Sequence, residues 1–582
     1  MSRKNTHLQS YRLVSATILL CLLVMAAVAV STTGEVESAA ADSMAVAPPQ
    51  PTAVYSYMGY SQIRDELLSV EAQHPGIAKV YDIGDSWEKS QSIADRDILA
   101  LKISDNVLLD EDEPEVLVVA LHHAREWISS EIVMEAIRNM TDGYGTDSRV
   151  SWLVDNRELW LVPVVNPDGI DYALSTDQWW RKNRRYNFDD TYGVDLNRNY
   201  GGSLNNDSAG AWGGVGSSHV PSSDVYCGVS PFSEPETQAI RNLVIQRNFT
   251  LCLDFHSYGE LVMWPWGYTA NLTSDNAALV SIGTQLAALN GYTADQSVGL
   301  YPTTGDSIDW FYGYDNIFAI LFEVATVFHP QTTQEASGVI AENMPPILLG
   351  IEIAGDRQQR QFAIAHLPVG AREYSASGFD LWANITADRG VDESAISLNY
   401  RIDGGLWVSV PMAIMSPNDT YLGAIPAQQP GCLVEYYIVA HDTGGVELMS
   451  PRYAPYEIHS FTVVDSLPPV ADAGDDLPAL VGSPILLNAS ASNDNTEIVS
   501  YTWTFSYNGS QVVLYGEVVA FTFWVAGSYE VLLNVSDSSG NYNTDIINVN
   551  VEDPYIPEFG SAMIISVSLL GMLLLLWLRR NR

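Results

Sequence analysis

The sequence predicts an α/β domain, in which helices flank a β-sheet, followed by one or two all-β sandwich modules. From Tyr55 to about Gly350, apolar strand-like runs alternate with helix-like segments, which is typical of an α/β sheet. After about Asp356, short alternating strands are separated by turn clusters, which is typical of all-β modules. At 582 residues the chain is too long for one ordinary core, so roughly two to four domains are expected.

The chain is strongly acidic. It has 70 Asp and Glu residues against 28 Lys and Arg residues, a formal net charge of -42. A surface this negative repels nucleic acid and anionic lipid headgroups. We therefore expect no nucleic-acid partner.

Residues 1–30 have the pattern of an export signal. Basic residues precede an apolar run over residues 13–30, and small residues follow it. A retained membrane anchor is the alternative, because the run is long for a signal peptide. Residues 31–54 are interpreted as a linker.

The opposite end, residues 553–582, predicts a membrane anchor or a sorting tail. An apolar run over residues 562–578 is followed by Arg579 and Arg580, as at the inner end of a short spanning helix. The preceding segment, residues 557–559, reads Pro-Glu-Phe and resembles the tripartite sorting tail of some archaeal surface proteins. Both interpretations predict a protein on the extracellular face of the cell membrane, or one that is secreted and anchored at the cell surface.

Within residues 55–352, three segments carry the α/β prediction. Residues 116–120 and 159–165 are expected to form strands, and residues 129–140 a helix. A fixed site is easily built where such a strand ends.

Residues 353–465 and 466–552 are the two expected sandwiches. The first contains residues 434–442, which resemble an immunoglobulin-like or fibronectin-like strand. The second contains Tyr501-Thr-Trp503 and the run over residues 527–537, and it looks like a polycystic-kidney-disease (PKD) module. We favour a spacer role for both modules over ligand binding.

Three cysteines follow the N-terminal segment, namely Cys227, Cys252 and Cys432. This odd number predicts at least one unpaired thiol in an exported protein. A Cys227–Cys252 bridge stays open, because spacing alone does not establish pairing.

His123 and Glu126 follow the first strand and begin the helix-like segment. A histidine and a glutamate three residues apart can point at one metal where a backbone turns into a helix, and both donors suit zinc. A catalytic zinc also takes a third protein ligand and leaves one position for water. His256, which follows another strand-like run, is the expected third ligand. His122 and His219 rank lower, because His122 alternates away from His123 along a strand and His219 lies in a Gly/Ser-rich loop.

A carboxylate closes a third apolar run, since Glu323 ends the strand-like residues 317–322. Burying it costs several kcal/mol unless it has a partner or a task. Beside a zinc-activated water it would act as general base and then as proton donor. A solvated strand end is the alternative interpretation.

Seven motifs, in this order, resemble the zinc carboxypeptidase A/B family over about residues 55–350. They are His123–Trp127, Asn166–Gly169, Trp180–Lys182, Gly193–Asn199, His256–Tyr258, Ser307–Trp310 after Tyr301, and Phe322–Glu323. Single motifs of this size occur by chance, whereas seven in order make coincidence implausible. The resemblance implies a mixed, twisted sheet flanked by helices, and one zinc ion per catalytic domain.

The resemblance also implies roles for individual residues. Zinc would be held by His123, Glu126 and His256, with water in the fourth position. Glu323 would take a proton from the attacking water, and Arg181 would help zinc to stabilise the oxyanion. The residues that would bind substrate are Arg125, Asn197, Arg198, Tyr258 and Tyr301. Among them, Asn197, Arg198 and Tyr301 would hold the terminal carboxylate.

The same resemblance implies a pocket for the terminal side chain. Ile308 at its base and Gly267 on its wall favour aromatic or aliphatic residues. Asp306 departs from the glycine typical of the mammalian enzymes and resembles the acidic pocket residue of some broad-specificity bacterial relatives. Lys and Arg therefore stay a second option for the terminal residue.

The sequence as a whole predicts an exported zinc metallocarboxypeptidase that acts on the C-termini of peptides or proteins, without an obligate protein partner. One alternative is a zinc amidase of cell-wall peptides, against which Asn197, Arg198 and Tyr301 argue. The other is a cell-surface adhesion protein with an inert peptidase-like domain. Inertness usually requires a lost ligand or base, and none is missing from the motifs.

Overall fold

The computed structural model describes residues 53–359, 361–415, 419–554, 572–577 and 579–580. The signal predicted at residues 1–30 lies outside these ranges, as does most of the apolar run predicted as an anchor at residues 562–578. None of the helices in the described part of the chain has the length and apolar character that crossing a membrane requires.

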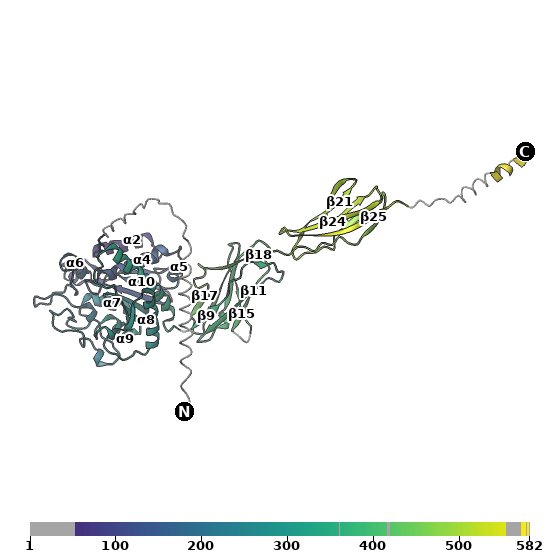
Figure 1. The fold of residues 1–582 in the computed structure, drawn as a ribbon. Coiled ribbons are helices and arrows are strands. Elements are labelled where there is room, and N and C mark those ends of the chain that lie inside the picture. Colours follow the sequence, from purple (N-terminus) through teal and green to yellow (C-terminus); the bar gives the residue numbers. More distant parts are fainter. Residues whose placement is uncertain (1–52, 360, 416–418, 555–571, 578, 581–582) are drawn as a thin grey trace, which may run out of the picture. The chain divides into compact units, whose positions relative to one another are not determined.

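Residues 78–324 contribute one eight-stranded sheet to an α/β domain (Figure 1). Its strands are β1 (Ala78–Asp85), β2 (Asp97–Ile103), β3 (Glu115–Ala120), β4 (Glu158–Val162), β5 (Phe249–Ser257), β6 (Leu261–Trp264), β7 (Thr293–Gln296) and β8 (Phe318–Val324). The order is β1-β2-β4-β3-β5-β8-β6-β7, with β4, β3, β5 and β8 parallel to one another. The pairs β1–β2, β2–β4 and β6–β8 are antiparallel, so the expectation of a mixed sheet is confirmed.

Helices cover both faces of this sheet. They are α2 (Tyr60–Gln73), α3 (Trp87–Ser90), α4 (Trp127–Gly143), α5 (Ser148–Val154), α6 (Pro167–Ser175), α7 (Pro235–Gln246), α8 (Asn276–Asn290), α9 (Ser307–Asp315) and α10 (Thr333–Ile353). Short 3-10 turns are η1 (Leu196–Arg198), η2 (Ser208–Gly210), η3 (Ser297–Gly299), η4 (Ala354–Asp356) and η5 (Glu393–Ala395). Residues of α2, α4, α5, α6, α8 and α10 pack on one face, and residues of α7 and α9 on the other.

Because helices cover both faces of the sheet, successive residues of the central strands are apolar, without alternation. In β3, Val116 and Val118 belong to the core on one face, while Leu117 and Val119 belong to the core on the other. All four side chains are fully buried, as expected for parallel strands between two helical layers.

Two predicted segments differ in length from the observed elements. The strand predicted over residues 159–165 ends at Val162, since Pro163 has no N–H for the ladder. The helix predicted over residues 129–140 begins earlier, at Trp127, with Glu126 as its N-cap residue.

The following residues form two β-sandwich cores, each described by itself. The first contains β9 (Phe362–Ala365), β10 (Arg372–Glu373), β11 (Phe379–Ala387), β12 (Ser397–Ile402), β13 (Val408–Pro411), β14 (Ala413–Ile414), β15 (Thr420–Ile425), β16 (Leu433–His441), β17 (Glu447–Ser450) and β18 (His459–Val464). The second contains β19 (Leu477–Leu480), β20 (Pro484–Asn488), β21 (Ile498–Tyr507), β22 (Ser510–Tyr515), β23 (Val518–Thr522), β24 (Gly527–Asp537) and β25 (Tyr542–Glu552). Inward side chains alternate with outward ones, as in β11 and β24.

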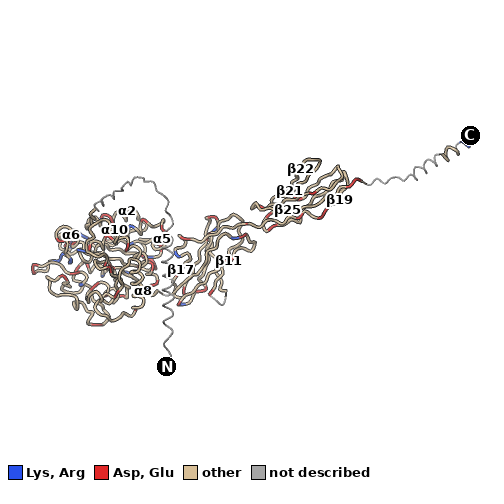
Figure 2. Tube along the Cα trace, in the orientation of Figure 1, with Lys and Arg blue, Asp and Glu red and all other residues tan. Residues whose placement is uncertain are grey.

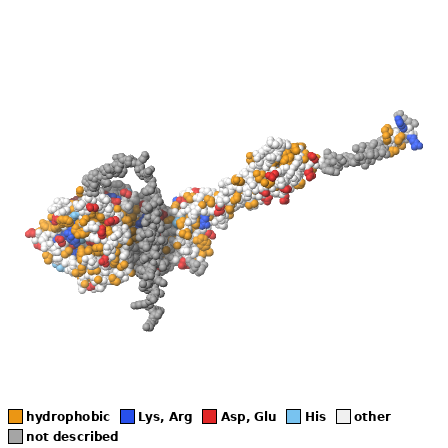
Figure 3. Space-filling view, in the orientation of Figure 1, with side chains coloured by type: hydrophobic (Ala, Val, Ile, Leu, Met, Phe, Trp, Pro, Cys, Tyr) orange, Lys and Arg blue, Asp and Glu red, His pale blue; other side chains and the backbone are white. Residues whose placement is uncertain are grey.

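The acidic residues are spread along the described chain, as Figure 2 shows. On the visible face of the space-filling view, Asp and Glu side chains lie among apolar and uncharged ones (Figure 3). The negative charge is therefore distributed over the modules rather than gathered in one of them.

Candidate functional site

The candidate site lies at the carboxyl ends of β3, β5 and β8, three neighbouring parallel strands. His123 follows β3, His256 is near the end of β5, and Glu323 is near the end of β8. His256 and Glu323 are paired residues of adjacent strands. Because parallel strands end at the same edge of a sheet, residues far apart in the sequence meet there.

Three buried side chains direct donor atoms toward one another. His123 Nδ1 lies 2.8 Å from Glu126 Oε1, and His256 Nδ1 lies 3.0 Å from Glu126 Oε2 and 3.2 Å from His123 Nδ1. Although Glu126 is the N-cap residue of α4, its side chain makes no capping hydrogen bond. Its carboxylate is directed at the two histidines instead.

This donor set fits one zinc ion. Two imidazole nitrogens and a carboxylate are usual catalytic zinc ligands, bound at about 2.0–2.2 Å. Two ring nitrogens that face each other at 3.2 Å repel through their lone pairs unless a proton or a cation lies between them. Burial lowers the pKa of His123, which favours the neutral imidazole that binds metal. Although burial lowers the pKa of His256, Asp254 and Glu126 raise it overall, so this position attracts positive charge.

Asp195 connects the metal donors to Arg181. Its Oδ1 lies 3.1 Å from His123 Nε2, and Arg181 donates through Nε to its Oδ2 at 3.0 Å. Although burial raises the pKa of Asp195, Arg181 and His123 hold it well below its usual range. The charged carboxylate fixes the direction of the imidazole and keeps Arg181 Nη1 3.9 Å from Glu126 Oε1.

Asn166 joins the loops that carry these residues. As the N-cap of α6, its side-chain oxygen accepts from Gly169 N at 2.9 Å. Its Nδ2 donates to His122 O at 3.1 Å and to Lys182 O at 3.2 Å. The first contact holds the segment before His123, and the second holds the segment of Arg181.

A pocket opens beside the donor set. It is lined by His123, Asn197, Arg198, Met263, Ser297, Leu300, Tyr301, Thr303, Asp306, Ile308, Leu321 and Glu323. Buried Arg198 donates through Nε to Gly216 O at 2.9 Å and through Nη1 to Asn197 O at 2.6 Å, neither of which is charged. The half-exposed ring of Tyr301 has its centre 5.9 Å from this guanidinium. The structure thus brings the predicted carboxylate-binding residues together.

Ile308, Asp306 and Gly267 meet near the start of α9. Ile308 is fully buried. Asp306 caps the helix, since its Oδ1 accepts from Asp309 N at 2.9 Å, and its Oδ2 accepts from Thr303 Oγ1 at 2.8 Å. Burial raises the pKa of Asp306. A Cβ on Gly267 would lie 2.4 Å from Thr303 Oγ1, so this wall has no room for a side chain.

Arg125 and Tyr258 contact Phe328 beside the donor set. The Arg125 guanidinium lies 4.6 Å from the Phe328 ring centre, and the Tyr258 ring meets Phe328 edge-on at 4.8 Å. Tyr258 is half-exposed. Its ring is therefore accessible next to His256.

His219 and the three cysteines, which the sequence analysis also considered, are not part of the donor set. His219 contacts Gly213 O at 3.1 Å and belongs to none of the metal-donor groups formed by the described residues. Cys227, Cys252 and Cys432 are free, so the Cys227–Cys252 bridge that spacing left open is not formed.

Two fully buried aspartates at the site, Asp195 and Asp254, were not predicted from the sequence. Each is a single carboxylate between apolar neighbours, Val194 and Leu196 in one case and Leu253 and Phe255 in the other. The cost of burying a carboxylate, which makes Glu323 a candidate, applies equally to both.

Comparisons with known proteins identify the family of this chain. The zinc carboxypeptidase family model matches residues 63–336, and the PKD domain model matches residues 466–551. A carboxypeptidase B of Astacus astacus is 32% identical over 266 residues, which cover 44% of this chain and 81% of that protein. The chain belongs to the zinc carboxypeptidase family, as its motifs predicted.

Two further relatives are also named carboxypeptidases. A zinc carboxypeptidase of Saccharothrix mutabilis subsp. capreolus is 33% identical over 302 residues, covering 49% of this chain and 66% of that protein. Carboxypeptidase O of Bos taurus is 35% identical over 212 residues, covering 35% of this chain and 54% of that protein. The chain thus matches little more than half to just under two thirds of these two proteins.

Proposed function

We propose that this protein is an exported zinc carboxypeptidase that releases single residues from the C-termini of peptides or proteins. The observation that carries the proposal is the donor set of His123, Glu126 and His256 at one pocket with Glu323 and Arg198. The three donor residues would hold the ion. When bound, zinc polarises the scissile carbonyl and lowers the pKa of a water molecule.

Glu323 is suited to move the proton. Burial and the neighbouring Glu126 raise its pKa to about 8, although His256 and Arg181 lower it. A zinc ion bound beside Glu323 would lower this pKa toward neutrality, where a carboxyl group can accept a proton and return it to the leaving amine. Glu323 would therefore act first as base and then as acid.

Two arginines would each contact a different negatively charged group of the substrate. Arg181, held by Asp195, lies next to the metal donors and would stabilise charge on the scissile carbonyl oxygen. Arg198, whose partners are neutral carbonyls, would bind the terminal carboxylate with Asn197 and Tyr301. Arg125 and Tyr258 would contact the peptide on the other side of the scissile bond.

The pocket favours aromatic or aliphatic terminal residues. Ile308, Met263, Leu300 and Leu321 line it with apolar surface. Asp306 is the one carboxyl group in this lining apart from Glu323, and both of its oxygens already accept hydrogen bonds. Since burial also raises its pKa, Asp306 is a weak partner for Lys or Arg, which stay secondary substrates.

Export and surface attachment are part of the proposal. They are supported by the signal pattern of residues 1–30 and by the basic residues that follow the apolar run of residues 562–578. The protein would then meet peptide C-termini at the extracellular face of the cell membrane, or as a secreted protein anchored at the cell surface.

The test uses N-blocked dipeptides that end in Phe, Leu or Lys, each with a free or an amidated C-terminus. We expect free Phe and Leu to be released fastest, Lys more slowly, and the amides hardly at all, because Arg198 needs a carboxylate. A chelator should abolish release and zinc should restore it. Equal hydrolysis of acids and amides would favour a zinc amidase, and no hydrolysis by folded, zinc-loaded protein would favour an inert binding protein.

A further inference from the structure

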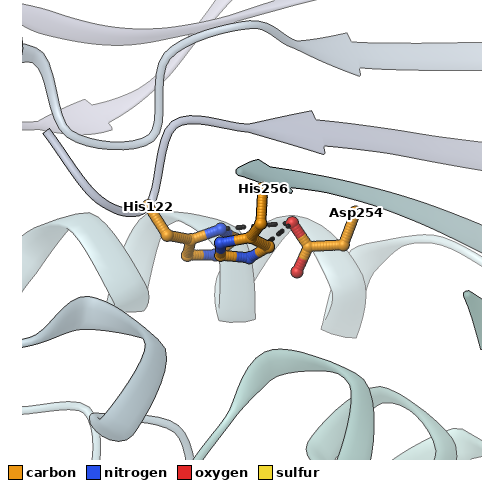
Figure 4. A group of neighbouring side chains, drawn as sticks. All are labelled: His122, Asp254 and His256. Carbon is orange, nitrogen blue, oxygen red and sulfur yellow. Dashed lines mark ion pairs between the residues drawn. The ribbon is translucent and has the colours of Figure 1, made fainter. Parts of the chain in front are cut away.

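A second buried group lies on the other side of the His256 ring. It consists of His122, Asp254 and His256, whose side chains are directed at one another (Figure 4). Asp254 and His256 are two residues apart on β5 and so project from the same face of the strand. His122 comes from the loop after β3, the neighbouring strand.

Asp254 is central to this group. Its Oδ1 lies 3.3 Å from His256 Nε2 and 3.3 Å from His122 Nδ1, while its Oδ2 accepts from Ser307 Oγ. On its far side, His122 Nε2 lies 2.8 Å from Tyr200 Oη. Asp254 and His122 are completely buried, and a buried carboxylate is costly unless its partners compensate.

We propose that Asp254 is a positioning residue, which holds His256 in the tautomer that binds the metal. The inference rests on the proposed zinc site. If Nδ1 of His256 gives its lone pair to the ion, the single ring proton must be on Nε2. That Nε2–H then needs an acceptor inside the protein.

Only one of the two groups beside Nε2 can accept this proton. Asn197 Nδ2 lies 3.3 Å from Nε2, and the amide is fixed in this orientation because its Oδ1 accepts from Ser307 N at 2.8 Å. An amide nitrogen is a donor, so Asn197 cannot receive the Nε2–H. Asp254 Oδ1, at the same distance, is an acceptor.

Without Asp254 the other tautomer would be preferred. Nε2 would accept from Asn197 Nδ2, and Nδ1–H would donate to Glu126 Oε2 at 3.0 Å. This arrangement places a proton where the ion binds. Asp254 therefore selects between a ring that binds metal and one that does not.

The arrangement parallels the one at His123. There, Asp195 Oδ1 lies 3.1 Å from His123 Nε2 and leaves Nδ1 for the ion. Each histidine donor thus has its own buried aspartate, and each aspartate has a second cationic or polar partner, Arg181 for Asp195 and His122 for Asp254.

A second ion held by His122, Asp254 and His256 is the competing interpretation of the same atoms. Ions on both nitrogens of His256 would require its ring to lose both protons, which a neutral imidazole resists. An arrangement in which His256 keeps one ring proton on Nε2, facing Asp254 Oδ1 at 3.3 Å, needs no such loss, so we expect one zinc per chain.

The test measures zinc affinity in the full-length protein by competition with a chromogenic chelator. We expect Asp254→Asn and Asp254→Ala to bind zinc roughly 10- to 100-fold more weakly than the wild type. Cys252→Ala is the matched control, because Cys252 is also fully buried and lies on the same strand and face. Its zinc affinity should stay within about threefold of the wild type, since it contacts neither ring nitrogen.

A second measurement needs no variant. The imidazole ¹⁵N shifts of zinc-loaded wild-type protein, labelled at histidine, should place the His256 proton on Nε2. A proton absent from that atom, folded Asp254 variants that bind zinc like the wild type, or two zinc ions per wild-type chain would each overturn the proposal. Failure of the zinc carboxypeptidase proposal would look different, because the wild type itself would then not bind zinc or release terminal residues.

Discussion

At the scale of single residues, several side chains of the site are held by a partner that fixes their charge or their direction. Asp195 holds Arg181 and His123, and Ser307 N fixes the amide of Asn197. Arg198 differs, because it donates its hydrogen bonds to main-chain oxygens, which are not charged. Its positive charge is therefore available to a ligand. Because of this difference we propose Arg198 as the residue that binds the terminal carboxylate of a substrate.

Replacing Arg198 by Met should weaken binding of substrates with a free C-terminus. A hydrogen bond to a charged group contributes about 1.5–3 kcal/mol, so kcat/KM should fall roughly 10- to 100-fold, mainly through KM. Steady-state kinetics with an N-blocked dipeptide ending in Phe measures the loss. Arg64→Met, on the partly exposed surface of α2, is the control and should leave kcat/KM unchanged. An unchanged KM in Arg198→Met would contradict the assignment.

At the scale of elements, the strands that carry the site could be predicted from the sequence. The side chains that contact the functional residues across the sheet could not. The apolar runs at β3, β5 and β8 stand out because both faces of the sheet are covered by helices. The partner of each functional side chain depends on the strand order β3-β5-β8, which joins segments distant in the sequence. His123, Glu126, His256 and Glu323 could be predicted from strand ends and motifs, whereas the contact of Asp254 with His122, which follows the neighbouring strand, could not.

A buried glutamate in the first turn of α7 should make the stability of the folded protein depend on pH. Glu236 is fully buried there, and burial, then Glu234 and Asp168, raise its pKa to about 8 from an ordinary 4.5. Between these values the folded protein retains a proton that the unfolded chain loses. The free energy of unfolding therefore falls as pH rises through this range, by up to ~1.4 kcal/mol per pH unit from this group.

Glu236→Gln should remove this contribution, because an amide does not titrate. Denaturant unfolding at several pH values between about 5 and 8 gives the slope, which should be smaller in the variant than in the wild type. Asp95→Asn is the control, since the Asp95 side chain is 91% exposed. A slope equal to that of the wild type in Glu236→Gln would mean that Glu236 is charged in the folded protein.

At the scale of the whole molecule, the described chain has separate hydrophobic cores. The α/β domain contains two, one on each face of its sheet, and each sandwich contains its own. All residues of the candidate site lie between His122 and Phe328. The sandwiches therefore contribute no side chain to it within the described chain.

A chain that ends after residue 465 should keep its peptidase activity. A module with its own core can be removed without unfolding its neighbour, so kcat/KM should stay within roughly twofold of the full-length protein. Kinetics with small dipeptides measures this, with circular dichroism as the check on folding. A tenfold or larger loss in a folded truncated protein would assign the PKD module a part in catalysis.

The central claim is that one zinc ion and Glu323 act together at the end of the sheet. The most direct measurement compares zinc content and release of Phe in the wild type and in Glu323→Gln, which has nearly the same shape but no base. We expect one zinc per chain in both proteins and a rate at least roughly 100-fold lower in the variant. Equal rates in two zinc-loaded proteins would contradict the account.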